Sequence, residues 1–280
     1  MLSNAELFRG TPLLGQGINI MRIFNTQNVI VLGLIGFGGF LGFWTLLSVS
    51  GLIPSLFLPS PASVIERFVF LLSHRFAGGT LIDHLWASML RFGGGFGLAV
   101  LIGVPLGLLM GWFRLLDDIV TPLFDAVRFI APIAWVPFAA LWFGTGIGGP
   151  IMIIFAGAFP PCLINAYRGA KFADPRLIEA AQMLGTPDRR MITEILLPSA
   201  VPSIIAGLRI SAGLGWQSLV GAELIVASTG IGYMMVQGQG NVSTTTVMAG
   251  MIGIGFIGMV IDIALRRVEE AILRRRGLSV

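Results

Sequence analysis

Long runs without a charged residue are the feature that most limits what this chain can fold into. An apolar helix needs about 20 residues to cross the roughly 30 Å hydrocarbon core of a bilayer. The charge-free runs cover residues 23–65, 92–113, 129–167 and 224–261, and a fifth, 195–222, is interrupted only by Arg209. Only 11% of the residues are charged, whereas about 25% is usual for a soluble domain. The sequence therefore predicts an all-α, polytopic membrane protein.

Proline and glycine clusters divide these runs into separate helices. Pro54, Pro59 and Pro61 end the first helix, because proline disrupts a helix interior. The 129–167 run is too long for one crossing, and a glycine-rich turn at 143–150 divides it into a hairpin of two helices. Six transmembrane helices are therefore expected, at roughly 28–50, 86–113, 121–143, 148–167, 198–227 and 244–266.

The basic residues predict the orientation, because loops rich in arginine and lysine tend to stay in the cytoplasm. Six spans put both termini on one side of the membrane. That side would hold the N-terminal segment 1–27, the loop 168–198 and the tail 271–280, with residues Arg9, Arg22, Arg168, Lys171, Arg176, Arg189, Arg190 and Arg274–Arg276. The opposite side holds only Arg67 and Arg75, near a predicted amphipathic surface helix at 62–73. We predict cytoplasmic termini, a transmembrane domain over 28–270, and a first helix retained as an anchor.

Several classes of function are excluded by residues that the sequence lacks. Cys162 is the only cysteine and the histidines are His74 and His84, so no metal-binding cluster is expected. The sole lysine, Lys171, does not follow a glycine, so the chain has no phosphate-binding loop for ATP. The net charge of +4 is too small for a nucleic-acid-binding face. We expect a non-catalytic membrane chain with no cofactor of its own.

A ridge of small residues follows the second predicted span. Its members recur every four positions: Gly95, Ala99, Gly103, Gly107 and Gly111. Residues at this spacing share one side of a helix and allow a neighbouring helix to approach closely. The ridge predicts close helix packing, either within the chain or at a homodimer seam or pore wall.

The loop between spans four and five has the punctuation of two short helices. Asp174 and Pro175 are typical of a helix start, and Gly185 is typical of a helix stop. Thr186 and Pro187 then begin a second helix, which should end at Leu197 before Pro198. The first helix is small and amphipathic, and such a helix suits a groove on a partner protein.

The spacing within this loop resembles the EAA motif of bacterial ATP-binding-cassette importer permeases, through which the permease docks on its ATPase. All seven defining positions match: Glu179, Ala180, Ala181, Gly185, Ile195, Leu197 and Pro198. Further segments resemble the nitrate, taurine and alkanesulfonate branch of the type I permeases: FLPSP (57–61), SMLR (88–91), GVPLG (103–107), PIAWVP (132–137), LWFG (141–144), GLRI (207–210) and GAEL (221–224). The resemblance covers about residues 55–270.

This resemblance implies a six-helix type I permease of the bacterial inner membrane. It would pair with a second copy of itself, bind two ATPase subunits that hold ATP and Mg, and receive substrate from a periplasmic or lipid-anchored binding protein. Taurine or another sulfonate is the expected substrate, followed by nitrate or a related oxyanion, and then by pyrimidine-type vitamin precursors. The glycine-rich stretch 236–241 departs from taurine-type members and leaves the ligand open. An ion-coupled secondary transporter is the rival class, against which the loop motif argues.

Ionisable residues inside spans are costly and often functional. Arg91 or Arg209 could present positive charge to an anion in the translocation path, with Asn165 and Gln217 as neutral hydrogen-bonding neighbours. Glu223 is a further candidate. The alternative for these charges, and for Arg128 and Asp262, is a structural ion pair or a side chain that reaches the membrane surface. Within one helix Arg209 and Glu223 are about 21 Å apart, so each needs another partner.

Overall fold

The computed structural model describes residues 26–275, and every regular element in that part of the chain is a helix. The predicted all-α fold class is therefore confirmed. The predictions made for segments 1–25 and 276–280, including those for Arg9, Arg22 and Arg276, concern residues outside the described part of the chain. The elements are α1 Thr26–Val49, α2 Pro61–Ser73, α3 Leu81–Trp112, α4 Arg114–Val127, the 3-10 helix η1 Pro132–Trp135, α5 Val136–Phe143, α6 Gly148–Lys171, α7 Pro175–Met183, α8 Asp188–Arg190, the π-helix η2 Met191–Leu196, α9 Leu197–Ile225, α10 Ile231–Gly240 and α11 Thr244–Arg275.

Five helices in the described part are long and apolar enough to cross a membrane, and a bent pair makes six if it counts as one span. The chain divides into two units after Ala62. In the first unit, the proline-rich segment folds back onto the end of α1. The indole Nε1 of Trp44 donates to the carbonyl of Pro59 at 3.1 Å, and the hydroxyl of Ser48 donates to the carbonyl of Leu58 at 3.0 Å.

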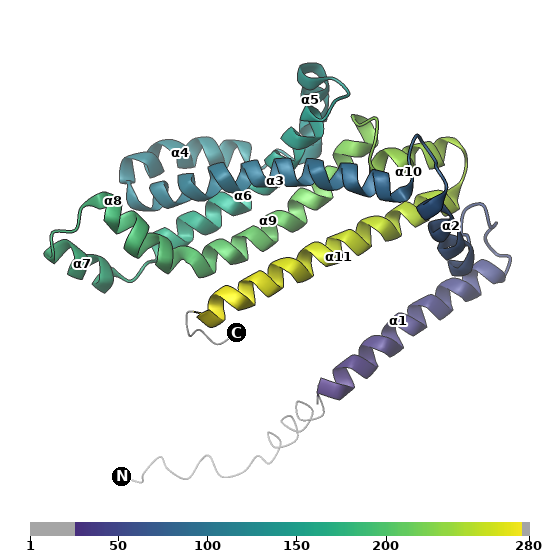
Figure 1. The fold of residues 1–280 in the computed structure, drawn as a ribbon, viewed down its shortest axis with the longest axis horizontal. Helices are drawn as coiled ribbons and strands as arrows, with labels where there is room; N and C mark the ends of the chain where they lie inside the picture. Colours follow the sequence, from purple (N-terminus) through teal and green to yellow (C-terminus); the bar gives the residue numbers. More distant parts are fainter. Residues whose placement is uncertain (1–25, 276–280) are drawn as a thin grey trace, which may run out of the picture. The chain divides into compact units, whose positions relative to one another are not determined.

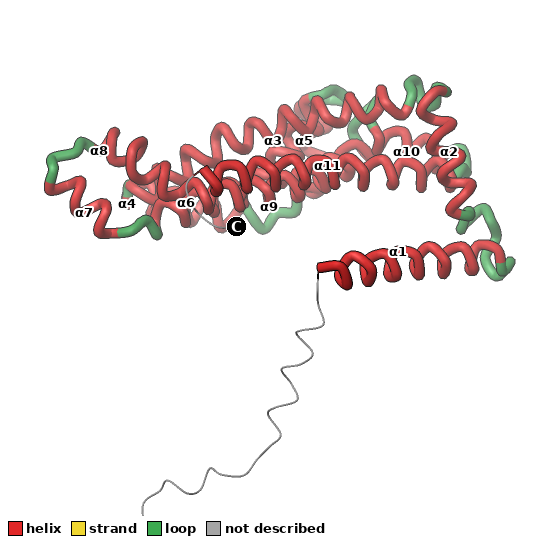
Figure 2. Tube along the Cα trace, turned by 60° about the horizontal axis from the view of Figure 1, so that its bottom comes forward, coloured by secondary structure: helices red, strands yellow, loops and turns green. Residues whose placement is uncertain are grey.

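The second unit is built around α3, α6 and α9, with α6 packed between the other two (Figure 1). α11 and α10 pack on α9, and α2 joins α10 and α11 through a cluster that includes Leu71, Ile231 and Ala249. The two views agree that α7 and α8 lie at one end of this bundle and α10 at the other (Figures 1 and 2).

The small-residue ridge of α3 is an intrachain packing surface. A Cβ atom added to Gly95 would lie 2.6 Å from Ile154, one added to Gly107 would lie 2.5 Å from the carbonyl oxygen of Leu163, and one added to Gly111 would lie 2.4 Å from Ala170. These contacts follow α6 along most of its length. Glycine therefore lets the two backbones approach closely, as small residues do in membrane helix pairs.

The third predicted span, 121–143, is not a single straight helix. It begins earlier, at α4, and bends by 85° between Val127 and Pro132 before continuing through η1 and α5. Pro132 forces the preceding Ala131 into an extended conformation, with φ −57° and ψ 139°, which no α-helix accommodates. Figure 1 shows α5 standing away from the line of α4.

Substituting Gly107 by Ala is expected to destabilise the bundle by about 1–3 kcal/mol, because the new methyl group would overlap the α6 backbone. Gly97→Ala is a matched control on the same helix, since nothing lies within 4 Å of a Cβ at that position. The melting temperature of the detergent-purified protein checks this. Equal melting temperatures for the two variants would show that the close α3–α6 contact is not needed.

Candidate functional site

The projecting helix α7 is fixed at both ends by local hydrogen bonds. The carboxylate of Asp174 accepts from the backbone N–H of Arg176 at 2.9 Å, and Pro175 occupies the first helical position. At the other end Gly185 has φ +71°, its N–H donates to the carbonyl of Gln182, and the N–H of Thr186 donates to the carbonyl of Ala181 at 3.1 Å. This pair of bonds is a Schellman stop. The residues that suggested helix ends in the sequence form them in the structure.

The seven motif residues divide into exposed and buried groups. Glu179 and Ala180 face outward, whereas Ala181 is only 7% exposed and faces its own chain, where α7 packs on η2. The small side chain of Ala181 therefore serves contact within the loop rather than an external surface. Further along the chain, Ile195 and Pro198 are half-buried.

The tip of this projection carries apolar side chains without cover. Met183 is 88% exposed, and Leu177, Leu184 and Phe172 are also exposed. Glu179 is exposed on the same helix. Apolar side chains grouped at one exposed end typically mark a protein interaction surface.

The second loop helix does not end at Pro198, so the predicted break there is wrong. Helical structure runs without interruption from Asp188 to Ile225, through the π-turns of η2 at Met191–Leu196. Proline has no N–H, and it fits the first turn of a helix, where that group has no intrahelical partner. The wider η2 segment places Pro198 in the first turn of α9. The second loop helix and the fifth span are therefore one continuous helix, whereas α7 is separated from them by the turn at Gly185.

A polar cluster ties α4 to α6 just before the loop. Asp117 of α4 accepts from the hydroxyl of Tyr167 at 2.7 Å and from the ammonium of Lys171 at 2.8 Å. Its other oxygen accepts from Thr121 at 2.7 Å, and Lys171 also contacts the Tyr167 hydroxyl. The end of α6 that leads into the loop is thus held to the start of α4.

Arg91 and Glu223 form an ion pair inside the bundle. Nη1 of Arg91 donates to Oε1 of Glu223 at 2.8 Å, and the two residues are 5% and 1% exposed. The Ser88 hydroxyl lies 2.8 Å from both carboxylate oxygens, and Nη1 of Arg91 also donates to the Thr229 carbonyl at 2.6 Å. Both charges are compensated within the chain. The structure therefore assigns this pair the structural role rather than a place facing an anion.

The same network fixes the turn between α9 and α10. The backbone N–H of Gly232 donates to Oε2 of Glu223 at 3.0 Å, and that of Ile231 donates to the Ser88 hydroxyl at 3.1 Å. Gly230, at φ +109°, leaves no room for a side chain, because a Cβ would lie 2.3 Å from the Glu223 carboxylate. Its N–H donates to Nδ1 of His84 at 3.2 Å. Nε2 of His84 is then the protonated nitrogen, and it donates to a backbone carbonyl at 2.9 Å.

Arg209 also has partners within the chain. Its Nε donates to Oδ1 of Asp262 on α11 at 2.7 Å, and its Nη1 lies 3.7 Å from Glu269. Asp262 in turn contacts Arg266 at 3.2 Å. The group is partly exposed and joins α9 to α11. The expected partner of Arg209 is therefore a residue of the sixth span, and its charge is balanced.

The neutral candidates lie on α6 and α9. Nδ2 of Asn165 donates to the Pro161 carbonyl at 2.8 Å, one helical turn back, and its side chain packs where Gly207 leaves space. Gln217 is exposed and lines a groove of about 340 Å³ formed by α6, α9 and the bend between α4 and η1. The groove also contains Arg128 and Ser218, which the sequence analysis did not single out as pathway residues. The prolines that follow Arg128 are the sequence signal for a break at this point.

The described part of the chain is thus an apolar, multi-helix bundle with a projecting two-helix loop. The fold is that of an importer permease: a chain of the MetNI methionine ABC transporter, in an inward-facing conformation, aligns with a TM-score of 0.58 at 20% identity, covering 69% of this chain and 95% of that one. Residues 103–277 match the family described as binding-protein-dependent transport system inner membrane component. The chain belongs to that family.

The names of related proteins agree with this assignment. A putative ABC transporter permease of Methanocaldococcus jannaschii is 40% identical over 74% of this chain and 79% of its own length. The taurine transport system permease of Escherichia coli is 35% identical over 84% of this chain and 85% of its own. The bicarbonate transport system permease of Synechococcus elongatus is 34% identical over 88% and 90%.

The chain is therefore a multi-pass inner-membrane permease subunit of an ABC importer. Permeases of this family are non-catalytic, and the family assignment implies an ATPase and a solute-binding protein as partners. The predicted family is confirmed. The described residues contain no group of three or more His, Cys, Asp or Glu side chains placed to hold a metal ion.

Replacing Arg91 by Met should destabilise the protein by about 3–5 kcal/mol, because Glu223 would remain buried without its cation. Glu223→Gln should have a similar cost. The double variant should lose much less than the sum of the two, since no unpaired charge remains. A double-mutant cycle of melting temperatures in detergent measures this coupling. Additive losses would contradict a direct ion pair.

Proposed function

We propose that this chain forms, with a second copy of itself, the membrane pathway of an importer for small sulfonates, taurine first. Two ATPase subunits would bind ATP and Mg and act on the exposed α7 projection. The single observation that carries the proposal is this helix, on which Glu179 and Ala180 face outward and Leu177 and Met183 are also exposed. A short amphipathic helix of this kind fits a groove on a partner.

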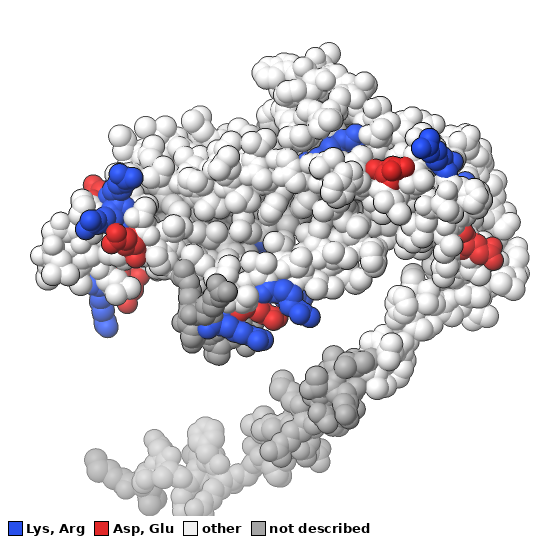
Figure 3. Space-filling view, viewed as in Figure 1, with Lys and Arg blue, Asp and Glu red and all other residues white. Residues whose placement is uncertain are grey.

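The distribution of charge supports a cytoplasmic position for this projection. Lysine and arginine side chains gather around α7 and α8 and near the end of α11 (Figure 3). Positively charged loops face the cytoplasm in multi-pass proteins. The ATPase is a cytoplasmic partner under this orientation, both termini lie on the same side, and α2 and α10 lie on the side where the binding protein delivers substrate.

The contacts of the loop indicate how a movement of α7 would be transmitted to the groove. Movement of α7 would pass to η2 through buried Ala181 and from there along the continuous helix to α9. α9 carries Gln217, which lines the groove. A rigid helix that reaches from the docking site to the pathway is a suitable element for alternating access driven by a partner.

The choice of substrate rests on the relatives. Relatives that are named for a substrate are transport permeases for taurine, aliphatic sulfonates or bicarbonate. These solutes are small and carry an anionic group. The described pathway residues suit such a solute only in part: Asn165 and Gln217 offer neutral hydrogen bonds, while Arg91, Arg209 and Glu223 are engaged with partners in the chain. Nitrate and related oxyanions are the next candidates by the same chemistry.

Affinity purification from native membranes in mild detergent tests the assembly. We expect an ATPase to co-purify at a one-to-one ratio with the permease, together with a second permease copy. A binding protein found in the same preparation can be titrated with taurine, methanesulfonate, nitrate and bicarbonate. A chain that stays alone, even after crosslinking through residues 174–190, would refute the docking role of α7.

Gly185→Val should abolish uptake without lowering the amount of protein in the membrane. The reason is conformational, because Gly185 has φ +71° and nothing lies within 4 Å of an added Cβ. Gly185→Asn is the matched control, since asparagine tolerates this region and should retain most of the uptake. ATPase co-purification and uptake are measured for both variants. Equal uptake by the Val and Asn variants would show that the angle of α7 does not matter.

A further inference from the structure

The bend between α4 and η1 opens beside the groove that contains Gln217. Residues 128–131 form no helix there, and Arg128 is the last residue before the chain turns. The α6 wall of the groove includes Ala156, Pro160 and Pro161, which lie about halfway along that helix and therefore roughly 18 Å from either helix end. Irregular backbone at membrane depth is tolerated where it is buried in protein or lines a water-filled cavity.

Arg128 differs from Arg91 and Arg209, the two arginines that the sequence suggested for the pathway. Arg91 is buried against Glu223, and Arg209 contacts two carboxylates. Arg128 has one ion-pair partner among the described residues, Asp125 on the same helix, at 3.0 Å through Nε, and its side chain remains 35% exposed. Of the three arginines, Arg128 has the charge that is least compensated by carboxylates. Its side chain also lines the groove.

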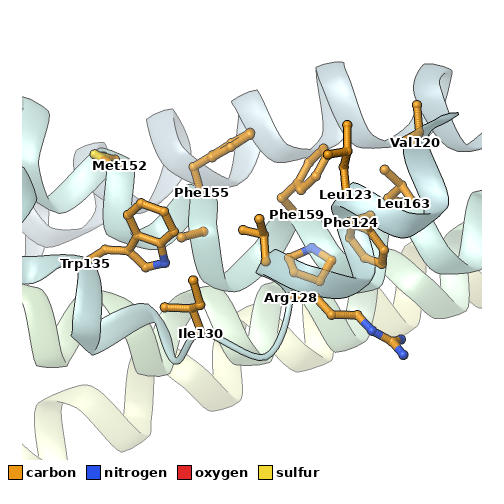
Figure 4. A pocket seen from close by; sticks show the side chains of 13 residues that line it. Val120, Leu123, Phe124, Arg128, Ile130, Trp135, Met152, Phe155, Phe159 and Leu163 are labelled. Carbon is orange, nitrogen blue, oxygen red and sulfur yellow. The ribbon is translucent and has the colours of Figure 1, made fainter.

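Neighbouring rings hold the Arg128 side chain in place. Its guanidinium carbon lies 4.8 Å from the ring centre of Phe129 and 5.8 Å from that of Phe124. An apolar pocket of about 350 Å³ lies on one side of the residue, between α4 and α6. The guanidinium points away from the apolar side chains of that pocket, among them Phe155 and Trp135 (Figure 4). The charge is thus kept out of the apolar pocket.

We infer that Arg128, with Gln217, forms the site in the pathway that contacts the anionic group of the transported solute. This inference rests on the proposed function and replaces Arg91 and Arg209 as the source of positive charge. The Gln217 amide supplies a neutral hydrogen-bond donor on the α9 wall of the groove, whereas the neighbouring Ser218 hydroxyl already donates to the carbonyl of Leu214 at 2.7 Å. Broken helices that line a cavity near the middle of a membrane commonly build substrate sites in transporters. A lipid phosphate does not fit this depth, because head groups lie outside the hydrocarbon core.

The test uses the complete importer, with its ATPase and binding protein, in proteoliposomes. Wild type is first assayed for uptake of taurine, methanesulfonate, nitrate and bicarbonate. With the anion that it carries, Arg128→Gln should reduce uptake about tenfold or more, and Arg128→Lys should retain part of it. Arg114→Gln is the matched control, because Arg114 is an exposed arginine at the start of the same helix. ATPase co-purification should be unchanged in every variant.

A second pair of variants separates contact with the solute from a structural ion pair. Asp125→Asn removes the carboxylate partner of Arg128 and should retain uptake. Arg128→Cys should be inactive, and should recover on reaction with 2-aminoethyl methanethiosulfonate, which restores a positive charge, but not with the sulfonatoethyl reagent. The one native cysteine, Cys162, is 1% exposed and so is shielded from both reagents.

The outcomes distinguish this inference from the proposed function. Wild type that carries none of the four anions would refute the substrate class, and the anion site with it. Wild type that carries one of them, with Arg128→Gln equally active, would overturn the anion site alone. So would equal losses in Arg128→Gln and Asp125→Asn, or recovery of the cysteine variant with both reagents alike, because a structural pair or a steric role would then suffice.

Discussion

The buried ion pair between Arg91 and Glu223 is the interaction on which the α10 end of the bundle depends. Two charges inside a membrane protein are tolerable when each compensates the other and most of the remaining lone pairs and protons find partners. Ser88 and the backbone N–H of Gly232 donate to the carboxylate, and Thr229 accepts from both Nη1 and Nη2 of the guanidinium, whose Nε is buried without a partner. The pair therefore links α3 and α9 and also sets the turn that leads to α10.

Close helix packing has the same role further along the bundle. At Gly107 and Gly111 the α3 backbone lies against α6 with no room for a methyl group. Without a hydrophobic driving force between helices in lipid, such van der Waals contact is a main source of association. At the loop end, Asp117 adds polar contacts between α4 and Lys171. Under the proposed function this rigidity is required, because a force applied at α7 would have to move whole helices rather than deform them.

Features that depend on local composition, such as helices and their caps, could be predicted from the sequence. Contacts between residues far apart in the chain could not. Charge-free runs, and residues such as Asp174 and Gly185, act within a few positions, and the helices and caps followed from them. The partner of Arg91 lies 132 positions away, and only the packing of α3 against α9 brings it within reach. The prediction that a helix ends before Pro198 was wrong, because proline is compatible with a helix when a wider π-turn precedes it.

The bend at Arg128 was missed for a related reason. Hydropathy depends only on how many residues are apolar and contains no information about the direction of the helix axis. The bent pair of α4 and η1–α5 therefore has the composition of one straight span. The bend nevertheless has a consequence for transport. A pathway site must attract the solute and still release it, which argues against an isolated charge in a low-dielectric cavity. Arg128 is half-compensated by Asp125 and partly exposed at a groove. As the inferred anion site, Arg128 would therefore attract an anion only moderately, and selective binding would be left to the solute-binding protein.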